Sequence, residues 1–183
     1  MSWRSIVIQS LPLFLVTLAL SVFAGAFIER SLASISKYPI LILVLPAFIG
    51  GCGNISNVFA ARLTSAFYFE GAQFVKERKA ILAKAAPILL SAGVFFFVLA
   101  LIALGAESVL GFSLPPLAPF VGSVLVSGLA TITLGIIVSI LVAWRSFKRR
   151  LDPDNFEAPI LSTFSDLVGV MVFLNVSRVL LGG

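Results

Sequence analysis

Histidine is absent from this 183-residue sequence, and cysteine occurs once. Zinc sites built from His and Cys, catalytic Ser-His-Asp or Cys-His groups, and disulfide bonds within the chain are therefore excluded. Charged residues make up only 11% of the chain, whereas an ordinary soluble domain has about 25%. Chemistry in this protein must rely on carboxylates, amides, hydroxyls and backbone carbonyls.

Hydrophobic residues are in excess, at 60% of the sequence against about 45–50% in soluble domains. This composition is typical of a membrane protein. Thirteen Lys and Arg against eight Asp and Glu give a net charge of +5. In a membrane protein, basic residues determine which loops stay in the cytoplasm and bind anionic lipid headgroups. We therefore expect lipids as partners and no nucleic acid.

Five stretches are long and apolar enough to cross a bilayer, since a helical span needs about 20 residues for about 30 Å of hydrocarbon. The sequence therefore predicts an all-α, polytopic membrane protein with one transmembrane domain over residues 1–183. The predicted spans are residues 11–28, 39–68, 85–104, 117–144 and 158–181. Basic connections separate the second span from the third and the fourth from the fifth, and the other two links are short.

The basic residues also predict an orientation, because cytoplasmic loops carry an excess of Lys and Arg. Five spans put the termini on opposite sides, with nine basic residues on the N-terminal side and three on the other. We therefore expect a cytoplasmic N-terminus, an outside C-terminus and a place in the cytoplasmic membrane. Arg4, the apolar stretch after it and Ala24-Gly25-Ala26 also resemble a secretory signal peptide, whose cleavage would leave four spans.

Asp166 is the one acidic residue inside the predicted spans. It follows the start of the fifth span by about eight residues, hence by about 12 Å. A carboxylate near the bilayer midplane costs roughly 2.5–3.5 kcal/mol, so it should face protein or water and is a functional candidate. The alternative is a structural role, with Asp166 protonated or paired with Arg62 of the second span. Ser162 precedes Asp166 by one helical turn, so the two share a helix face.

The second span offers oxygen ligands at a similar depth. A glycine cluster at residues 50–53 permits close backbone approach, while Asn54 and Asn57 are three positions apart and project to one side. The depth of Asn54 in the membrane matches that of Ser162. The polar residues of the second span and those of the fifth span could therefore line one pathway for an ion. Helix packing is the alternative interpretation of these residues.

Small residues recur every four positions in the fourth span. Such a stripe lets another helix approach closely, so we expect a helix-packing seam here rather than the lining of a pore. Its members are Ser123, Ser127, Thr131, Gly135, Ser139 and Ala143.

Several of these residues belong to a longer pattern. The run from Gly50 to Asn57 follows Pro46, and Leu151-Asp152-Pro153 leads to Pro159 and to the segment from Leu161 to Gly169. Together they resemble the transmembrane domain of the MgtE magnesium transporters, a family related to solute carrier family 41. The resemblance extends over all five spans in order.

This resemblance implies a homodimeric, five-helix pathway for Mg²⁺. It also implies a central metal site that uses Asp166, with Asn54 and Asn57 nearby and the backbone of Ser162 facing the ion. Ser56, Val58 and Ala158 stand where the family commonly has Gly, Gln and Asn. Bacterial relatives add cytosolic N and CBS domains that sense magnesium, and we expect neither domain within these 183 residues.

Charge independently favours a homodimer, because one carboxylate cannot balance a divalent ion in a low-dielectric passage. Two chains related by a twofold axis would bring two copies of Asp166 to one site. Mg²⁺ requires octahedral oxygen coordination and keeps much of its water, which suits a site with one or two carboxylates. Mn²⁺ and Ca²⁺ use the same oxygens and remain alternatives.

The expected function is therefore a divalent cation channel or transporter, with Mg²⁺ as the first candidate ion. Exchange coupled to Na⁺ or H⁺ is one alternative, and a non-transporting scaffold subunit is another. We do not expect an enzyme, because an intramembrane aspartyl protease needs two neighbouring carboxylates and the predicted spans contain one.

The cytoplasmic connections generate a prediction about regulation. The longest of them, Glu70 to Lys84, has 15 residues, which is too few for a folded sensor domain. The purified chain in liposomes should therefore lack a steep shut-off by millimolar Mg²⁺ on its cytoplasmic face. The measurement is flux against Mg²⁺ on that face at constant driving force. A sharp, cooperative closure would contradict the prediction and direct attention to Asp152, Asp154 and Glu157.

Overall fold

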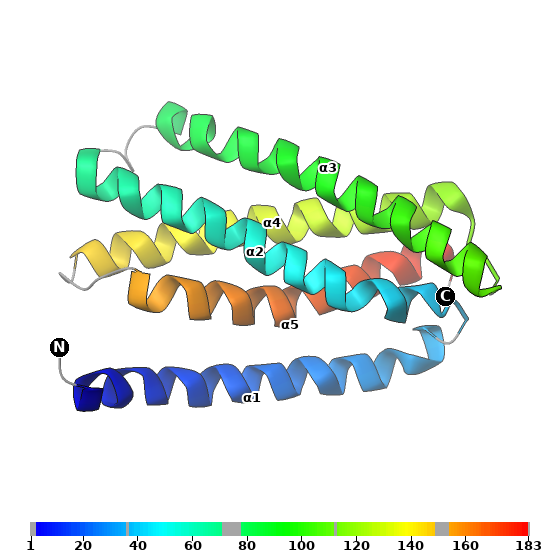
Figure 1. Ribbon diagram of the computed structural model, residues 1–183, viewed down its shortest axis with the longest axis horizontal. Helices are drawn as coiled ribbons and strands as arrows, with labels where there is room; N and C mark the ends of the chain where they lie inside the picture. Colours follow the sequence, from blue (N-terminus) through cyan, green and yellow to red (C-terminus); the bar gives the residue numbers. More distant parts are fainter. Residues whose placement is uncertain (1–2, 36, 71–77, 112, 149–153, 183) are drawn as a thin grey trace.

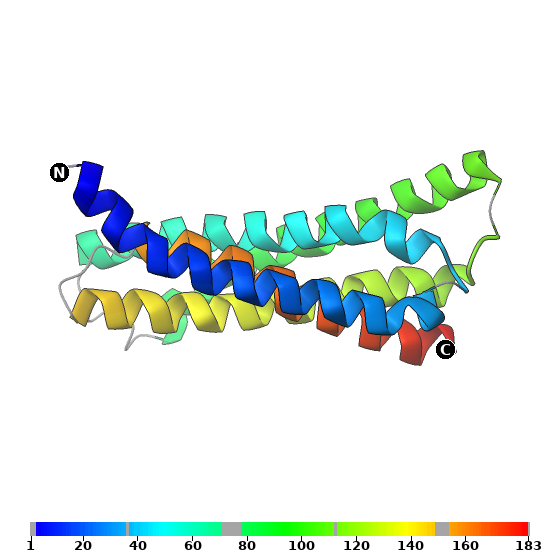
Figure 2. The same cartoon turned by 90° about the horizontal axis from the view of Figure 1, so that it is seen from below.

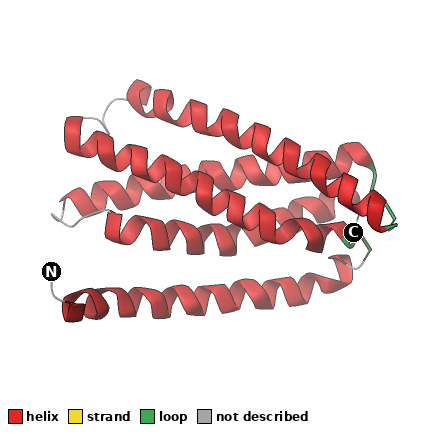
Figure 3. Cartoon of the chain, in the orientation of Figure 1, coloured by secondary structure: helices red, strands yellow, loops and turns green. Residues whose placement is uncertain are grey.

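The computed structural model describes residues 3–35, 37–70, 78–111, 113–148 and 154–182, nearly all of them helical (Figures 1 and 3). The helices are α1 (Trp3–Ile35), α2 (Ile40–Glu70), α3 (Arg78–Leu110), α4 (Leu117–Lys148) and α5 (Asp154–Leu181). Each contains a segment long and apolar enough to cross a membrane, and the described parts contain no strand. The all-α, five-span prediction is confirmed. Lys76 and the Leu151-Asp152-Pro153 motif lie outside the described residues.

The helices run along one axis in alternating directions, so α1 begins at one end of the bundle and α5 finishes at the other (Figure 1). The side of the membrane on which each end lies stays a prediction. With 31 residues, α2 is about 46 Å long and exceeds the hydrocarbon thickness of about 30 Å. Its two ends therefore extend into the headgroup regions.

The link between α3 and α4 is shorter than the sequence indicated. The predicted third span ends at residue 104, but α3 continues to Leu110. Gly111 follows with a φ of 76°, and its backbone N–H donates to the Glu107 carbonyl over 3.1 Å. This left-handed glycine is a common helix C-cap, and it places Glu107 inside the helix.

α5 is the central helix of the bundle. It packs against α1, α2 and α4, while α3 packs against α2 and α4 on the far side. Figure 1 shows α1 along one edge, next to α5, and Figure 2 shows it crossing the bundle obliquely. Most of the described side chains of α1 are exposed, as expected of a helix in contact with lipid. The residues of α5 therefore face three other helices.

The small-residue stripe of α4 is buried along its whole length, which confirms the predicted seam. A Cβ added at Gly135 would lie 2.6 Å from the hydroxyl oxygen of Ser56 on α2. One added at Gly169 of α5 would lie 3.6 Å from the Thr131 side chain. The seam therefore holds α4 against both α2 and α5.

Phenylalanine rings fill the centre of the bundle. The Phe48 ring centroid lies 5.1 Å from that of Phe96 and 4.6 Å from that of Phe173. All three side chains are fully buried, and Cys52 is buried in the same core. Gly128 makes room for Phe96, because a Cβ at this position would overlap the Phe96 ring.

This packing predicts that Gly128→Ala destabilises the bundle. The added methyl group must displace a buried ring, and overpacking of this kind costs about 1–3 kcal/mol. The control is Gly105→Ala in α3, where a Cβ meets nothing within 4 Å and the helix gains up to about 1 kcal/mol. Equilibrium unfolding in detergent micelles measures both changes. Equal unfolding free energies for the two variants would contradict the packing at Gly128.

Candidate functional site

Two of the polar residues singled out by the sequence, Asn57 and Ser162, meet where α2 and α5 pack together, with Asp166 one turn further along α5. A Cβ added at Gly53 would lie 3.9 Å from the Cα of Ser162 and 4.0 Å from the Cβ of Ser165. Gly53 therefore allows the two backbones to approach closely. Because the helices are antiparallel, this contact also sets their register and places Asp166 at the level of Gly53 and Asn54.

One polar contact in this interface joins two of the predicted site residues. The Asn57 side-chain amide nitrogen donates to the Ser162 hydroxyl oxygen over 3.4 Å, at the long end of the hydrogen-bond range. The Asn57 amide oxygen is buried, and no described residue gives it a hydrogen bond. An acceptor oxygen therefore lies beside the α2–α5 contact with its bonding capacity unused.

Asp166 is half-buried and lies one helical turn beyond Ser162 on α5. It is within two residues of the midpoint of this helix, as the span prediction required. Arg62 and Asp166 are both described, and they form no ion pair. Nine residues separate Arg62 from Gly53, about 13 Å along α2. An ion pair with Arg62 therefore does not stabilise the Asp166 carboxylate.

Asn54 takes no part in the Asn57–Ser162 contact. Its side chain is exposed and lines a pocket of about 450 Å³ together with Gly50, Val58 and Phe95. Asn54 is also one residue from the midpoint of α2. A single chain therefore leaves the Asn54 amide exposed close to the middle of α2.

Glu157, which the sequence suggested only as a residue at a cytoplasmic helix end, is a buried carboxylate inside the fifth membrane-spanning stretch. Its side chain is 2% exposed. The Thr64 hydroxyl of α2 donates to Oε2 over 2.8 Å, and the Ser139 hydroxyl of α4 donates to Oε1. The conclusion that Asp166 is the one acidic residue within the spans was therefore wrong. The partners of Glu157 are distant in sequence, so only the fold reveals the two hydroxyl groups that bond it.

Glu107 is a second acidic residue that the predicted spans wrongly left out. It lies in the membrane-spanning stretch of α3 and is 1% exposed, and no described residue bonds its Oε1 atom. The described residues contain no cluster of three or more His, Cys, Asp or Glu. A cation bound near Asp166 would therefore depend on one carboxylate per chain, supplemented by amides, hydroxyls and water.

Comparison with protein families gives one match. A family model described as MgtE, divalent cation transporter, matches residues 45–176. The match includes Asp166, Asn54, Asn57 and Ser162, together with most of α2 and α5 and all of α3 and α4. No curated protein matches the chain.

The Glu157 contacts predict that Thr64→Val destabilises the bundle. The substitution removes a hydrogen bond to a buried carboxylate, and such contacts between membrane helices contribute about 0.6–1.7 kcal/mol. Thr133→Val is the matched control, since the Thr133 hydroxyl is exposed and bonds the Leu129 carbonyl of its own helix. A double-mutant cycle with Glu157→Leu, which removes the acceptor oxygens, isolates the contact. A coupling energy of zero would contradict it.

Proposed function

The chain belongs to the MgtE family of divalent cation transporters, and we propose that it conducts Mg²⁺ across the cytoplasmic membrane as a homodimer. The observation that carries this proposal is the half-buried Asp166 carboxylate at the centre of α5, beside the Asn57–Ser162 contact. MgtE is a family of transporters and not of enzymes, which agrees with the chemistry available to this sequence.

The homodimer follows from charge and exposure. A divalent ion beside one Asp166 keeps an excess positive charge, which a low-dielectric passage does not tolerate. A second chain across a twofold axis supplies the missing carboxylate. Asn54 supports the same arrangement, because an exposed amide near the middle of α2 needs a partner surface or a water-filled passage. We therefore assign the outward face of α2 around Asn54 to the dimer axis and the ion pathway.

Within this pathway the ion keeps much of its hydration. Asp166 from both chains provides the charge, and Asn54, Asn57 and Ser162 provide neutral oxygens at neighbouring depths. Mg²⁺ binds well to such sites, because it gives up water reluctantly and needs few protein ligands. Mn²⁺ and Ca²⁺ are the competing ions, since carboxylate and amide oxygens bind them too.

Exchange coupled to Na⁺ or H⁺ is a second candidate, and the buried Glu157 is the observation that favours it. A carboxylate bonded by two hydroxyls is a group on which a proton or a small cation could reside. Flux measured with and without a Na⁺ or proton gradient separates the two functions. Passive conduction predicts equal Mg²⁺ flux in both conditions, whereas coupled exchange predicts flux that follows the gradient.

Removing the charge of Asp166 tests the proposed site. Asp166→Asn is nearly isosteric, so the variant should assemble as the wild type does. Mg²⁺ flux in liposomes should fall on the order of tenfold or more, because two charges leave one site. Glu29→Gln, an exposed change in α1, is the control. Wild-type flux in Asp166→Asn would overturn the site, and an unfolded variant in size-exclusion chromatography would support a structural role for Asp166.

The two amides should contribute less than the carboxylate, because they bring dipoles rather than charge. Asn54→Ala and Asn57→Ala are expected to weaken Mg²⁺ affinity or the preference for Mg²⁺ over Ca²⁺ while some flux remains. Asn175→Ala is the matched control on α5, since this exposed amide bonds the Met171 carbonyl of its own helix over 2.7 Å. If both test variants keep the wild-type Mg²⁺ affinity and the wild-type preference for Mg²⁺ over Ca²⁺, the two amides do not bind the ion and α2 serves only in helix packing.

A further inference from the structure

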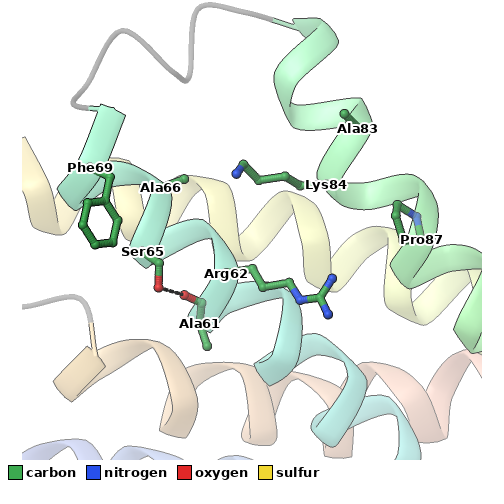
Figure 4. Close-up of a pocket in the computed structure, with 8 residues that line it drawn as sticks. All are labelled: Ala61, Arg62, Ser65, Ala66, Phe69, Ala83, Lys84 and Pro87. Atoms are coloured by element: carbon green, nitrogen blue, oxygen red, sulfur yellow. Dashed lines mark hydrogen bonds between the residues drawn. The ribbon is translucent and has the colours of Figure 1, made fainter.

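A second polar site lies farther along the α2–α3 groove than the Asn54 pocket, between the end of α2 and the start of α3. A pocket of about 470 Å³ opens there, and its two charged lining residues are Arg62 and Lys84. Figure 4 shows the Arg62 and Lys84 side chains extending from their separate helices into the space between them. The remaining lining is mostly apolar and includes Phe69 and Pro87. The pocket therefore combines two basic side chains with apolar walls.

The depth of this pocket coincides with the boundary between hydrocarbon and headgroups. Arg62 lies seven residues from the midpoint of α2 and Lys84 ten residues from that of α3. With the helix midpoints placed at the membrane centre, these positions are about 11 and 15 Å from it at 1.5 Å per residue, and the hydrocarbon ends at about 15 Å. A phospholipid places its phosphate just beyond this level, within reach of both side chains.

We propose that this pocket binds the headgroup of an anionic phospholipid. The phosphate would lie between the Arg62 guanidinium and the Lys84 ammonium, and the apolar walls would contact the glycerol and the first methylene groups of the chains. Basic pockets between membrane helices recognise anionic lipids by this combination of charge and depth. Lys79, Arg145 and Lys148 lie at the same end of the bundle and increase its positive potential.

Two other occupants fit the pocket less well. A second copy of this chain would bring its own Arg62 and Lys84 across a twofold axis, so like charges would face each other. Free inorganic phosphate would gain from the two cations but would leave the apolar walls at the edge of the hydrocarbon unused. A lipid uses both features of the pocket, and lipid is always present at this depth.

Native mass spectrometry of the detergent-solubilised protein tests the proposal. Phosphatidylglycerol should remain bound in preference to phosphatidylcholine. The double variant Arg62→Gln, Lys84→Gln should bind phosphatidylglycerol about thirtyfold more weakly, at about fivefold for each basic residue near the surface. The matched control is Lys79→Gln, Arg145→Gln, which removes the same charge from exposed positions at the same end.

Several outcomes would overturn the proposal. Wild-type lipid binding in the double variant would do so, and so would an equal loss in the control, because binding would then follow net charge alone. Displacement of phosphatidylglycerol by equimolar inorganic phosphate would make the pocket a site for free phosphate. The same spectra report the oligomeric state. A dimer lost in the double variant together with the lipid would make the pocket a subunit interface. Retained assembly with weakened lipid binding supports the lipid site, whatever ion the protein transports.

Discussion

The cost of placing charge inside hydrocarbon is the constraint on which the rest of this structure depends. An acidic residue in a transmembrane helix needs a donor, a counter-ion or water, because the lipid offers none. Glu157 has its donors within one chain, since hydroxyls of α2 and α4 bond its two carboxylate oxygens. Asp166 is only half-buried and forms no ion pair with Arg62. The chain thus stabilises one carboxylate by hydrogen bonds of its own and leaves Asp166 half-buried without an ion pair to Arg62.

Close helix packing brings these polar groups together. Helices in a membrane gain no hydrophobic energy from burying apolar surface against each other, so small side chains decide where they approach. Gly53 brings α2 against α5 at the level of Asp166, and the stripe on α4 closes the other side of α5. Because α5 contacts α1, α2 and α4, a substitution at one of these small residues would shift α5 and the candidate ion site on it. None of these small residues is itself proposed to bind the ion.

Composition and hydropathy were sufficient to predict the five helices and the α4 seam, because apolar length and small-residue spacing are local properties of a sequence. The depth of Asp166 was predictable for the same reason. The roles of Glu157 and Glu107 were not, since both lie near the edge of an apolar stretch, where a solvated position is the simpler expectation. Asn54 and Asn57 show a similar limit. Their spacing suggested one side of the helix, yet only Asn57 contacts Ser162, because Asn54 faces the groove beside Phe95.

The central claim is that one divalent ion is shared by two copies of Asp166. Anomalous diffraction from dimer crystals soaked in Mn²⁺ tests it most directly, because Mn²⁺ uses the same oxygen ligands as Mg²⁺ and is visible by its scattering. Our account predicts a single peak on the twofold axis between the two Asp166 carboxylates, and no peak in crystals of Asp166→Asn. A peak that persists in the variant, or one confined to a single chain away from Asp166, would contradict it.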